Sequence, residues 1–221
     1  MINLVIYTAI FGNFDILKPP KIINPDVKYI CFTDKKIECL PWEIVVVNPE
    51  FQDFRRENRK YKILSHKYLP DFEYSIYIDG NFIIMRDLSK YVKKWLDNND
   101  IAVLKHPKRR CLYDEAEYCI LKGVEENIIR NQINRYKAEG YPKNNGLTVN
   151  RLIIRKHTEK IKQFNEAWWN EVKNNSDRDQ ISFLFIIYKC KINYSTIPIK
   201  NRGYFAQRYF KVVNHNQITP P

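Results

Sequence analysis

Short apolar runs that each end in a polar loop constrain the fold of this 221-residue chain more than any other feature. The first run covers residues 4–10, the second covers residues 28–34, and the third covers residues 42–47. A fourth, residues 74–78, leads into an Asp-Gly-Asn turn. Buried strands of this kind are typical of a parallel sheet, whose carboxyl ends meet at one edge and gather ligands there.

Helical segments alternate with these runs. Apolar residues recur at helical spacing in five stretches, which are residues 55–69, 88–96, 111–138, 159–172 and 176–189. A further apolar stretch covers residues 147–154. We therefore predict an α/β fold, a single domain with a Rossmann-like, mixed but mostly parallel central sheet flanked by helices. The domain is expected to span residues 1–213, and residues 214–221 are expected to be a tail or a linker to a further domain of a longer protein.

Composition is that of an ordinary globular chain, with 44% hydrophobic and 28% charged residues. The formal net charge of +12 favours anionic partners such as phosphates. No run of five or six basic residues marks a nucleic-acid arm, so no nucleic-acid partner is expected, although a basic nucleic-acid-binding module stays an alternative.

Sequence signals also bear on location and on other enzyme classes. The apolar start of the chain lacks a basic leader and soon becomes polar, which predicts neither a signal peptide nor a membrane span. Five widely spaced cysteines without a CxxC pair indicate reduced thiols and a cytoplasmic location. The glycine motifs of dehydrogenases and P-loop enzymes and the serine-hydrolase elbow are all absent from the sequence.

The turn Asp79-Gly80-Asn81 is the strongest chemical signal. A carboxylate delivered by a buried strand can hold a divalent cation on oxygen ligands, and Gly80 lets the backbone approach a nucleotide closely. An Asp-Gly-Asn sequence is also common in plain turns, so a purely structural role is the alternative.

Two further clusters carry charge. Arg59 and Lys62 stand on one face of the helix predicted over residues 55–69, together with Arg55 and His66, and are candidates for binding phosphate or sugar. Asp179 and Gln180 open the last predicted helix. The alternatives are a solvated basic face for the first cluster and an acid that favours the helix dipole for the second.

Three motifs, which are residues 7–12, 29–34 and 77–81, resemble those of a GT-A-type glycosyltransferase family that includes plant pectin and mucilage enzymes. The resemblance covers nearly the whole chain and is strongest to an N-terminal glycosyltransferase domain from a chlorovirus, which helps to glycosylate the major capsid protein. It implies metal-dependent transfer of a sugar from a nucleoside diphosphate, with uridine diphosphate (UDP) as the expected carrier. Mn²⁺ is the expected cation, with Mg²⁺ as the alternative. The implied acceptor is a glycan or glycoprotein, such as a viral capsid glycan, in the host cytoplasm if the chain is viral.

The resemblance also implies roles for individual residues. Donor nucleotide binding is assigned to Thr8, Ala9, Phe11, Gly12, Thr33, Asp34, Arg59, Lys62, Asp79 and Gly80. The metal ligands would be Asp79, Asn81 and the C-terminal His215, and the catalytic pair would be Asp179 and Gln180. Because family members usually carry a second acid where this chain has Asn81, we expect the metal to bind together with the nucleotide phosphates.

The acceptor side is assigned by the same resemblance to His106, Arg109, Tyr113 and Glu115. Trp168 and Trp169 are read as core residues rather than a sugar-stacking platform. The sequence leaves open the donor sugar, the acceptor, the stereochemical course and the oligomeric state. A catalytically weak domain that binds a glycan or an acidic partner on the same fold stays an alternative.

Overall fold

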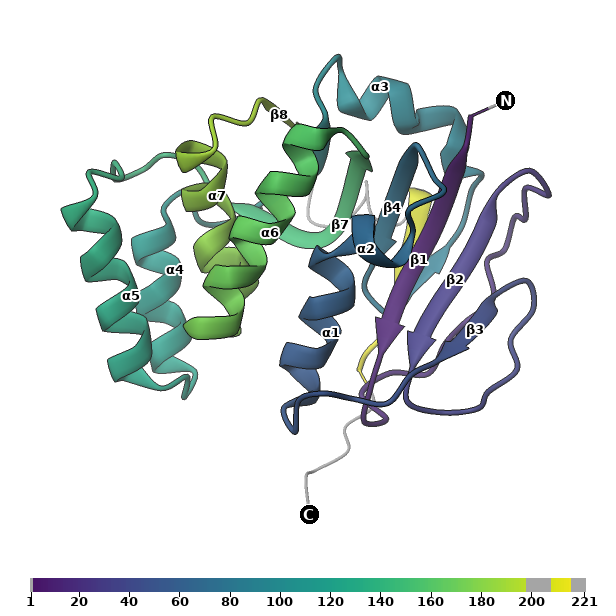
Figure 1. Ribbon diagram of the computed structural model, residues 1–221, viewed down its shortest axis with the longest axis horizontal. Coiled ribbons are helices and arrows are strands. Elements are labelled where there is room, and N and C mark those ends of the chain that lie inside the picture. The colour runs from purple at the N-terminus through teal and green to yellow at the C-terminus, as the bar shows by residue number, and fades with distance from the viewer. Residues whose placement is uncertain (1, 198–207, 216–221) are drawn as a thin grey trace.

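A seven-stranded mixed sheet forms the centre of the protein (Figure 1). The computed structural model describes residues 2–197 and 208–215. The strand order is β3-β2-β1-β4-β7-β6-β8, and β7 runs antiparallel to both of its neighbours while the other pairings are parallel. This arrangement confirms the predicted mixed, mostly parallel sheet. The strands are β1 (Leu4–Ile10), β2 (Lys28–Thr33), β3 (Glu43–Val46), β4 (Tyr74–Ile78), β6 (Ile101–Lys105), β7 (Thr148–Lys156) and β8 (Tyr194–Ile197).

Helices cover both faces of the sheet because alternate strand residues need apolar cover on each side. One face packs against α1 (Phe54–Ile63), α6 (Glu159–Asn174) and α7 (Asp179–Lys189), beyond which lie α4 (Leu112–Leu121) and α5 (Glu126–Ala138) (Figure 1). The other face packs against η1 (Leu88–Tyr91) and α3 (Val92–Leu96). Trp168 is fully buried and Trp169 nearly so, which confirms their interpretation as core residues.

Several predicted elements differ from the observed ones. The helix predicted over residues 55–69 is broken at Leu64 into α1 and α2 (Ser65–Tyr68). Strands β6 and β8 were not predicted, and neither was β9 (Phe210–Val212), which pairs with β5 (Phe82–Ile84) in a small second sheet. Asn214 and His215, predicted to begin the tail, follow directly on this paired segment, whereas residues 216–221 lie outside the described part of the chain.

The order of the strands reverses beside β1. The chain builds β1, β2 and β3 outward in one direction and then returns through α1 and α2 to place β4 on the other side of β1. Ligands of open α/β sheets bind at such a reversal, outside the carboxyl ends of the strands. The loops after β1 and β4 are therefore where the fold places a site.

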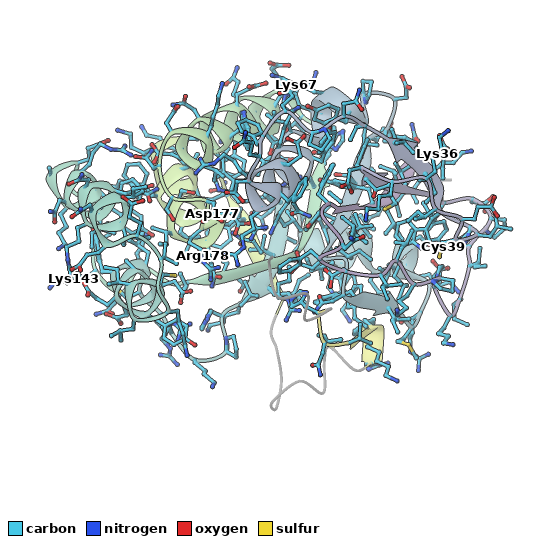
Figure 2. The ribbon with its side chains drawn as sticks, turned by 90° about the horizontal axis from the view of Figure 1, so that it is seen from below. Lys36, Cys39, Lys67, Lys143, Asp177 and Arg178 are labelled. Carbon is cyan, nitrogen blue, oxygen red and sulfur yellow. The ribbon has the colours of Figure 1, made fainter. Side chains whose placement is uncertain are left out.

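Positive charge is spread over the molecule. Lys36, Lys67 and Lys143 lie at widely separated places on it (Figure 2). All five cysteines are unpaired. Among the described residues, no helix combines the length and the apolar character needed to cross a membrane.

Candidate functional site

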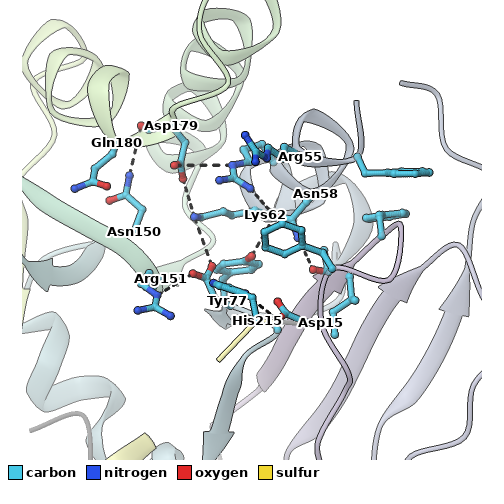
Figure 3. Close-up of a pocket in the computed structure, with 18 of the residues that line it drawn as sticks. Asp15, Arg55, Asn58, Lys62, Tyr77, Asn150, Arg151, Asp179, Gln180 and His215 are labelled. Carbon is cyan, nitrogen blue, oxygen red and sulfur yellow. Dashed lines mark hydrogen bonds and ion pairs between the residues drawn. The ribbon is translucent and has the colours of Figure 1, made fainter. Parts of the chain in front are cut away.

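A cavity of about 300 Å³ opens at the carboxyl ends of β1 and β4. This volume is at the lower end of the range for small-molecule sites. Residues of the β1 end, α1, the β4 turn, β7 and the start of α7 line it, together with the C-terminal His215 (Figure 3). The lining residues that carry charge are Asp15, Arg55, Arg59, Lys62, Asp79, Arg151, Arg178 and Asp179.

The turn after β4 presents Asp79 to the cavity. The Asp79 backbone N–H donates to the carbonyl of Arg151 at 3.0 Å, and the Asp79 carbonyl accepts from Phe82 N–H at 3.0 Å, which closes the turn. A Cβ at Gly80 would lie 2.7 Å from the Ile10 side chain and 3.0 Å from the Asp15 carboxylate. Glycine is required here because the turn packs directly against the end of β1.

Lys62 and Asp179 form a buried ion pair at the centre of the cavity, 2.7 Å apart (Figure 3). Their side chains are 4% and 9% exposed. Lys62 Nζ also lies 3.9 Å from Asp79, and Arg59 Nε lies 4.0 Å from Asp179. The fold thus brings together four of the residues singled out in the sequence, from α1, the β4 turn and α7.

Burial and pairing act in opposite directions on these two groups. Burial lowers the pKa of the Lys62 ammonium below its ordinary value, although Asp179 and Asp79 oppose the shift. Burial alone would raise the pKa of Asp179, but the charges of Lys62 and Arg59 outweigh it and hold that pKa below its ordinary value. Asp179 is therefore ionised at neutral pH and accepts a proton poorly.

Of the three residues predicted as metal ligands, Asn81 and His215 lie in contact, whereas Asp79 is joined to Asn81 through Arg151. Asp79 and His215 line the cavity, and Asn81 is buried behind it. Asn81 donates to the Val213 carbonyl at 2.9 Å, and its side-chain nitrogen lies 3.4 Å from Nε2 of His215. The other ring nitrogen of His215 lies 2.8 Å from the carboxylate of Asp15. A carboxylate on one nitrogen of an imidazole orients the ring, and here it turns Nε2 of His215 toward the Asn81 side chain.

The donor set suits a divalent cation that is shared with a substrate. A carboxylate, an amide oxygen and an imidazole are acceptable ligands for Mn²⁺. Among the described residues, no group of three His, Cys, Asp or Glu side chains is arranged to hold a metal ion by itself. Phosphate oxygens would have to complete such a site.

Most of the remaining donor residues divide between two neighbouring cavities. Ala9 and Phe11 line the first cavity, whereas Thr33 and Asp34 line a second, of about 400 Å³, which shares Ile10 and Asp15 with the first. Gly12 links the two loops, since its N–H donates to both oxygens of Asp34 at 3.3 Å. Thr8 is buried within β1, and neither Thr8 nor Gly12 is among the residues that line the two cavities.

The predicted acceptor residues lie outside the cavity lining and bond to one another. Arg109 pairs with the buried Glu115, and His106 accepts from the Arg109 backbone N–H at 2.7 Å. Tyr113 donates to the Tyr141 carbonyl at 2.8 Å. Burial lowers the pKa of His106 despite the nearby Glu115. His66, which was expected to share the basic face of α1, instead lies in α2 and contacts Glu166.

Some cavity residues were missed in the sequence. Asp15 and Asn58 are among them, and Asn58 donates to the Ala9 carbonyl. Arg151 is the most informative omission, because a charged residue inside the apolar stretch 147–154 was itself a signal. Gln180 was predicted and lines the cavity beside Asp179.

A mixed α/β sheet with a cation-lined cavity at its switch point is an arrangement that GT-A-like glycosyltransferases share with other nucleotide-binding α/β proteins. The sequence model of the TOD1/MUCI70 glycosyltransferase-like domain matches residues 1–218, and the chain belongs to this family. The Arabidopsis thaliana protein named "Probable hexosyltransferase MUCI70" is 28% identical over 244 aligned residues, covering 95% of this chain and 42% of that protein. "Alkaline ceramidase TOD1" from the same plant is 24% identical over 223 residues, covering 83% of this chain and 48% of its own. The chain thus spans less than half the length of these curated relatives.

Of two solved structures that resemble this chain, one shares the fold. The apo WbbM bifunctional glycosyltransferase superposes with a TM-score of 0.51 at 12% identity, over 89% of this chain and 38% of that one. A glycosyltransferase involved in glycosylation of the major capsid of PBCV-1 gives a TM-score of 0.44 at 7% identity, over 71% and 66%. At 12% identity the likeness to the first structure concerns the fold alone, and the second superposition is too weak to support an inference.

Proposed function

We propose that this domain transfers a sugar from a nucleoside diphosphate, with UDP as carrier, onto a glycan or glycoprotein acceptor. The observation that carries the proposal is the Lys62, Asp179 and Asp79 cluster in the cavity at the β1 and β4 ends, with Arg59 beside it. A diphosphate leaving group needs fixed positive charge where its own negative charge develops. Membership of a family with a named hexosyltransferase supports a hexose as the transferred sugar, with a pentose as the alternative.

Each group has a part in this proposal. The nucleoside would lie at the second cavity beside Thr33 and Asp34, which places the diphosphate toward Lys62 and Arg59. Asp79, Asn81 and His215 would hold Mn²⁺, or Mg²⁺ in its place, which would neutralise phosphate charge when bound. The ionised Asp179 is suited to stabilising positive charge at the anomeric carbon, and Gln180 to contacting the sugar or acceptor hydroxyl.

Ceramide hydrolysis, the activity in the name of the second relative, fits the cavity less well. Several basic side chains line the cavity, and they complement phosphate rather than the long apolar chains of a ceramide. The acceptor is proposed to approach from the α4 side, where Arg109 and Glu115 lie near Arg178 of the cavity. The unpaired thiols favour the cytoplasm, the host cytoplasm for a viral chain, as the working compartment.

Asp79→Asn tests the proposal. We expect the melting temperature of the wild-type chain to rise only when UDP and Mn²⁺ are added together, and UDP-sugar hydrolysis to require the metal. Asp79→Asn should lose that shift and at least about 100-fold in turnover, because the amide cannot supply the carboxylate charge. Calorimetry and a coupled UDP-release assay provide the two measurements.

One control variant and two contrary results complete the test of the proposed sugar transfer. Asp114→Asn removes an exposed carboxylate of α4 outside the cavity lining and should leave both readouts unchanged. UDP binding without turnover over a panel of donors and acceptors would favour a glycan-binding domain. Salt-dependent binding to duplex DNA that UDP does not compete would instead indicate a nucleic-acid module.

A further inference from the structure

Arg151 stands directly across from the Asp79 turn because of strand register. In the antiparallel pair β4 and β7, Ile78 lies opposite Leu152. Asp79, the residue after Ile78, therefore lies opposite Arg151, the residue before Leu152. The Asp79 N–H bond to the Arg151 carbonyl fixes this approach. The Arg151 side chain lines the cavity and is 35% exposed, so it has room to move.

The Arg151 guanidinium bridges two side-chain oxygens of the Asp79-Gly80-Asn81 turn, one from Asp79 and one from Asn81. Its Nε lies 3.2 Å from Oδ2 of Asp79, and its terminal nitrogen lies 2.9 Å from Oδ1 of Asn81. The guanidinium carbon also lies 4.9 Å from the centre of the Phe82 ring. A planar fork that bonds two oxygens at once and packs on a ring is the geometry at which arginine differs from lysine.

These contacts occupy the atoms that a metal would use. Asp79 Oδ2 and Asn81 Oδ1 both accept from Arg151, and Asp79 Oδ1 faces the ammonium of Lys62 at 3.9 Å. A divalent cation placed against the same oxygens would lie next to two fixed positive charges. The repulsion falls when an anion draws the side-chain cations away from the carboxylate.

We propose that Arg151 is a latch that holds the Asp79 and Asn81 oxygens until the nucleotide binds and then moves to the diphosphate. This inference rests on the proposed function, since it concerns the same site. One guanidinium exchanges one anionic partner for another, and its departure frees the oxygen ligands for the metal. Metal and nucleotide then bind cooperatively, each raising the affinity for the other by the same factor.

Arg151→Met removes the latch and keeps an unbranched side chain over Phe82. The probe is Mn²⁺ alone, followed by electron paramagnetic resonance of the free ion, on the 221-residue chain with and without UDP. We expect Arg151→Met to bind Mn²⁺ without UDP at least about tenfold more tightly than the wild type. In Arg151→Met, the factor by which UDP raises the affinity for Mn²⁺ should be smaller than in the wild type by the same ratio.

Two variants separate the latch from simple charge removal. Arg55→Met deletes a positive charge from the same cavity without touching the bridging contacts, and should raise Mn²⁺ affinity less than Arg151→Met. Arg151→Lys keeps the charge but loses the fork, and should fall between wild type and Arg151→Met. Melting temperatures of all variants check that each is folded.

The outcomes of the latch test and of the function test are distinct. Equal gains in Mn²⁺ affinity in Arg151→Met and Arg55→Met, or no gain in Arg151→Met, would overturn the latch. UDP-sugar turnover would still support the transferase in either case. Absence of Mn²⁺ binding in every variant, with UDP and without, would overturn both the latch and the metal site. UDP-sugar turnover that persists in a chelator would then keep the transferase and discard only the metal.

Discussion

At the scale of single residues, the buried pair of Lys62 and Asp179 links stability to function. Each side chain loses most of its hydration, so the pair is tolerated because each charge neutralises the other at 2.7 Å. Asp179 also faces Arg59 at 4.0 Å, and Asp79 lies 3.9 Å from Lys62, so these four charges balance. The positive charge available to a bound anion comes from the other cations that line the cavity, Arg55, Arg151 and Arg178, which outnumber the one remaining carboxylate, Asp15.

Lys62→Met should therefore cost both stability and activity. Removing one partner leaves the Asp179 carboxylate buried without its main neutralising charge, which typically destabilises a protein by about 3–5 kcal/mol. The double variant Lys62→Met with Asp179→Leu should recover much of that loss, yet remain inactive. Urea unfolding and UDP-sugar turnover are the two measurements.

Lys67→Met is the matched control for this pair. Its ammonium lies 2.8 Å from Glu166, but both side chains are about half exposed, so the expected loss is below about 1 kcal/mol. If Lys62→Met were no less stable than Lys67→Met, the ion pair of Lys62 and Asp179 would contribute nothing measurable to the free energy of unfolding. That result would contradict the prediction.

At the scale of elements, the loops after β1 and β2 are joined through Gly12. Its φ of +61° is in the left-handed region, and a Cβ there would lie 2.3 Å from the Phe54 ring. Phe54 lines the cavity. The conformation of this loop and the position of a cavity side chain are thus set by one residue without a side chain.

Gly12→Ala should weaken UDP binding as well as stability. The left-handed backbone costs about 1–2 kcal/mol for alanine, and displacing the Phe54 ring adds about 1–3 kcal/mol. Gly140→Ala is the control, because Gly140 has a φ of +77° and a Cβ there meets nothing within 4 Å. Thermal unfolding and UDP titration of both variants test this; equal losses in the two would contradict a role for the Phe54 contact.

The elements also show how far sequence reasoning reaches. The run predicted over residues 4–10 coincides with β1, and residues 74–78 coincide with β4, because both are buried on two faces and read as continuous apolar stretches. The prediction of a site at the carboxyl ends of these two strands followed from their assignment. Strand β6 was missed although residues 101–104 are a buried apolar run, because a run of four residues is too short to show a period. Strands β8 and β9 are short and partly exposed, and long-range pairing with β6 and β5 stabilises them.

The same reasoning explains which site residues were found. Lys62, Asp79 and Asp179 stand beside recognisable motifs and are brought together in the cavity. Arg151 and Asp15 reach it only through strand pairing and the course of the β1 loop, which local patterns do not encode. The metal and acceptor assignments stay predictions.

At the scale of the whole molecule, two partly buried imidazoles link stability to pH. Burial, together with the charge of Arg155, lowers the pKa of His157 to about 4. The pKa of His66 is also lowered, again chiefly by burial. The folded protein therefore keeps these rings neutral at a pH where the unfolded chain protonates them, near 6.5.

Stability should accordingly fall as the pH drops below about 6.5. The unfolded state then binds more protons than the folded state, so the free energy of unfolding decreases until the folded His157 itself protonates near pH 4. For His157 alone, the loss between pH 7.5 and 5.5 is about 1 kcal/mol. Urea unfolding at the two pH values measures it.

His157→Gln isolates this contribution, because each protein is compared with itself at two pH values and any uniform change in stability cancels. The variant should lose about 1 kcal/mol less than the wild type between pH 7.5 and 5.5, with the remaining slope due to the other histidines. The window lies above the pKa range of the carboxylates, so Asp179 does not contribute to it. Equal slopes in wild type and His157→Gln would mean that the His157 ring, 2.8 Å from Ser75 Oγ, is protonated as easily in the folded protein as in the unfolded chain.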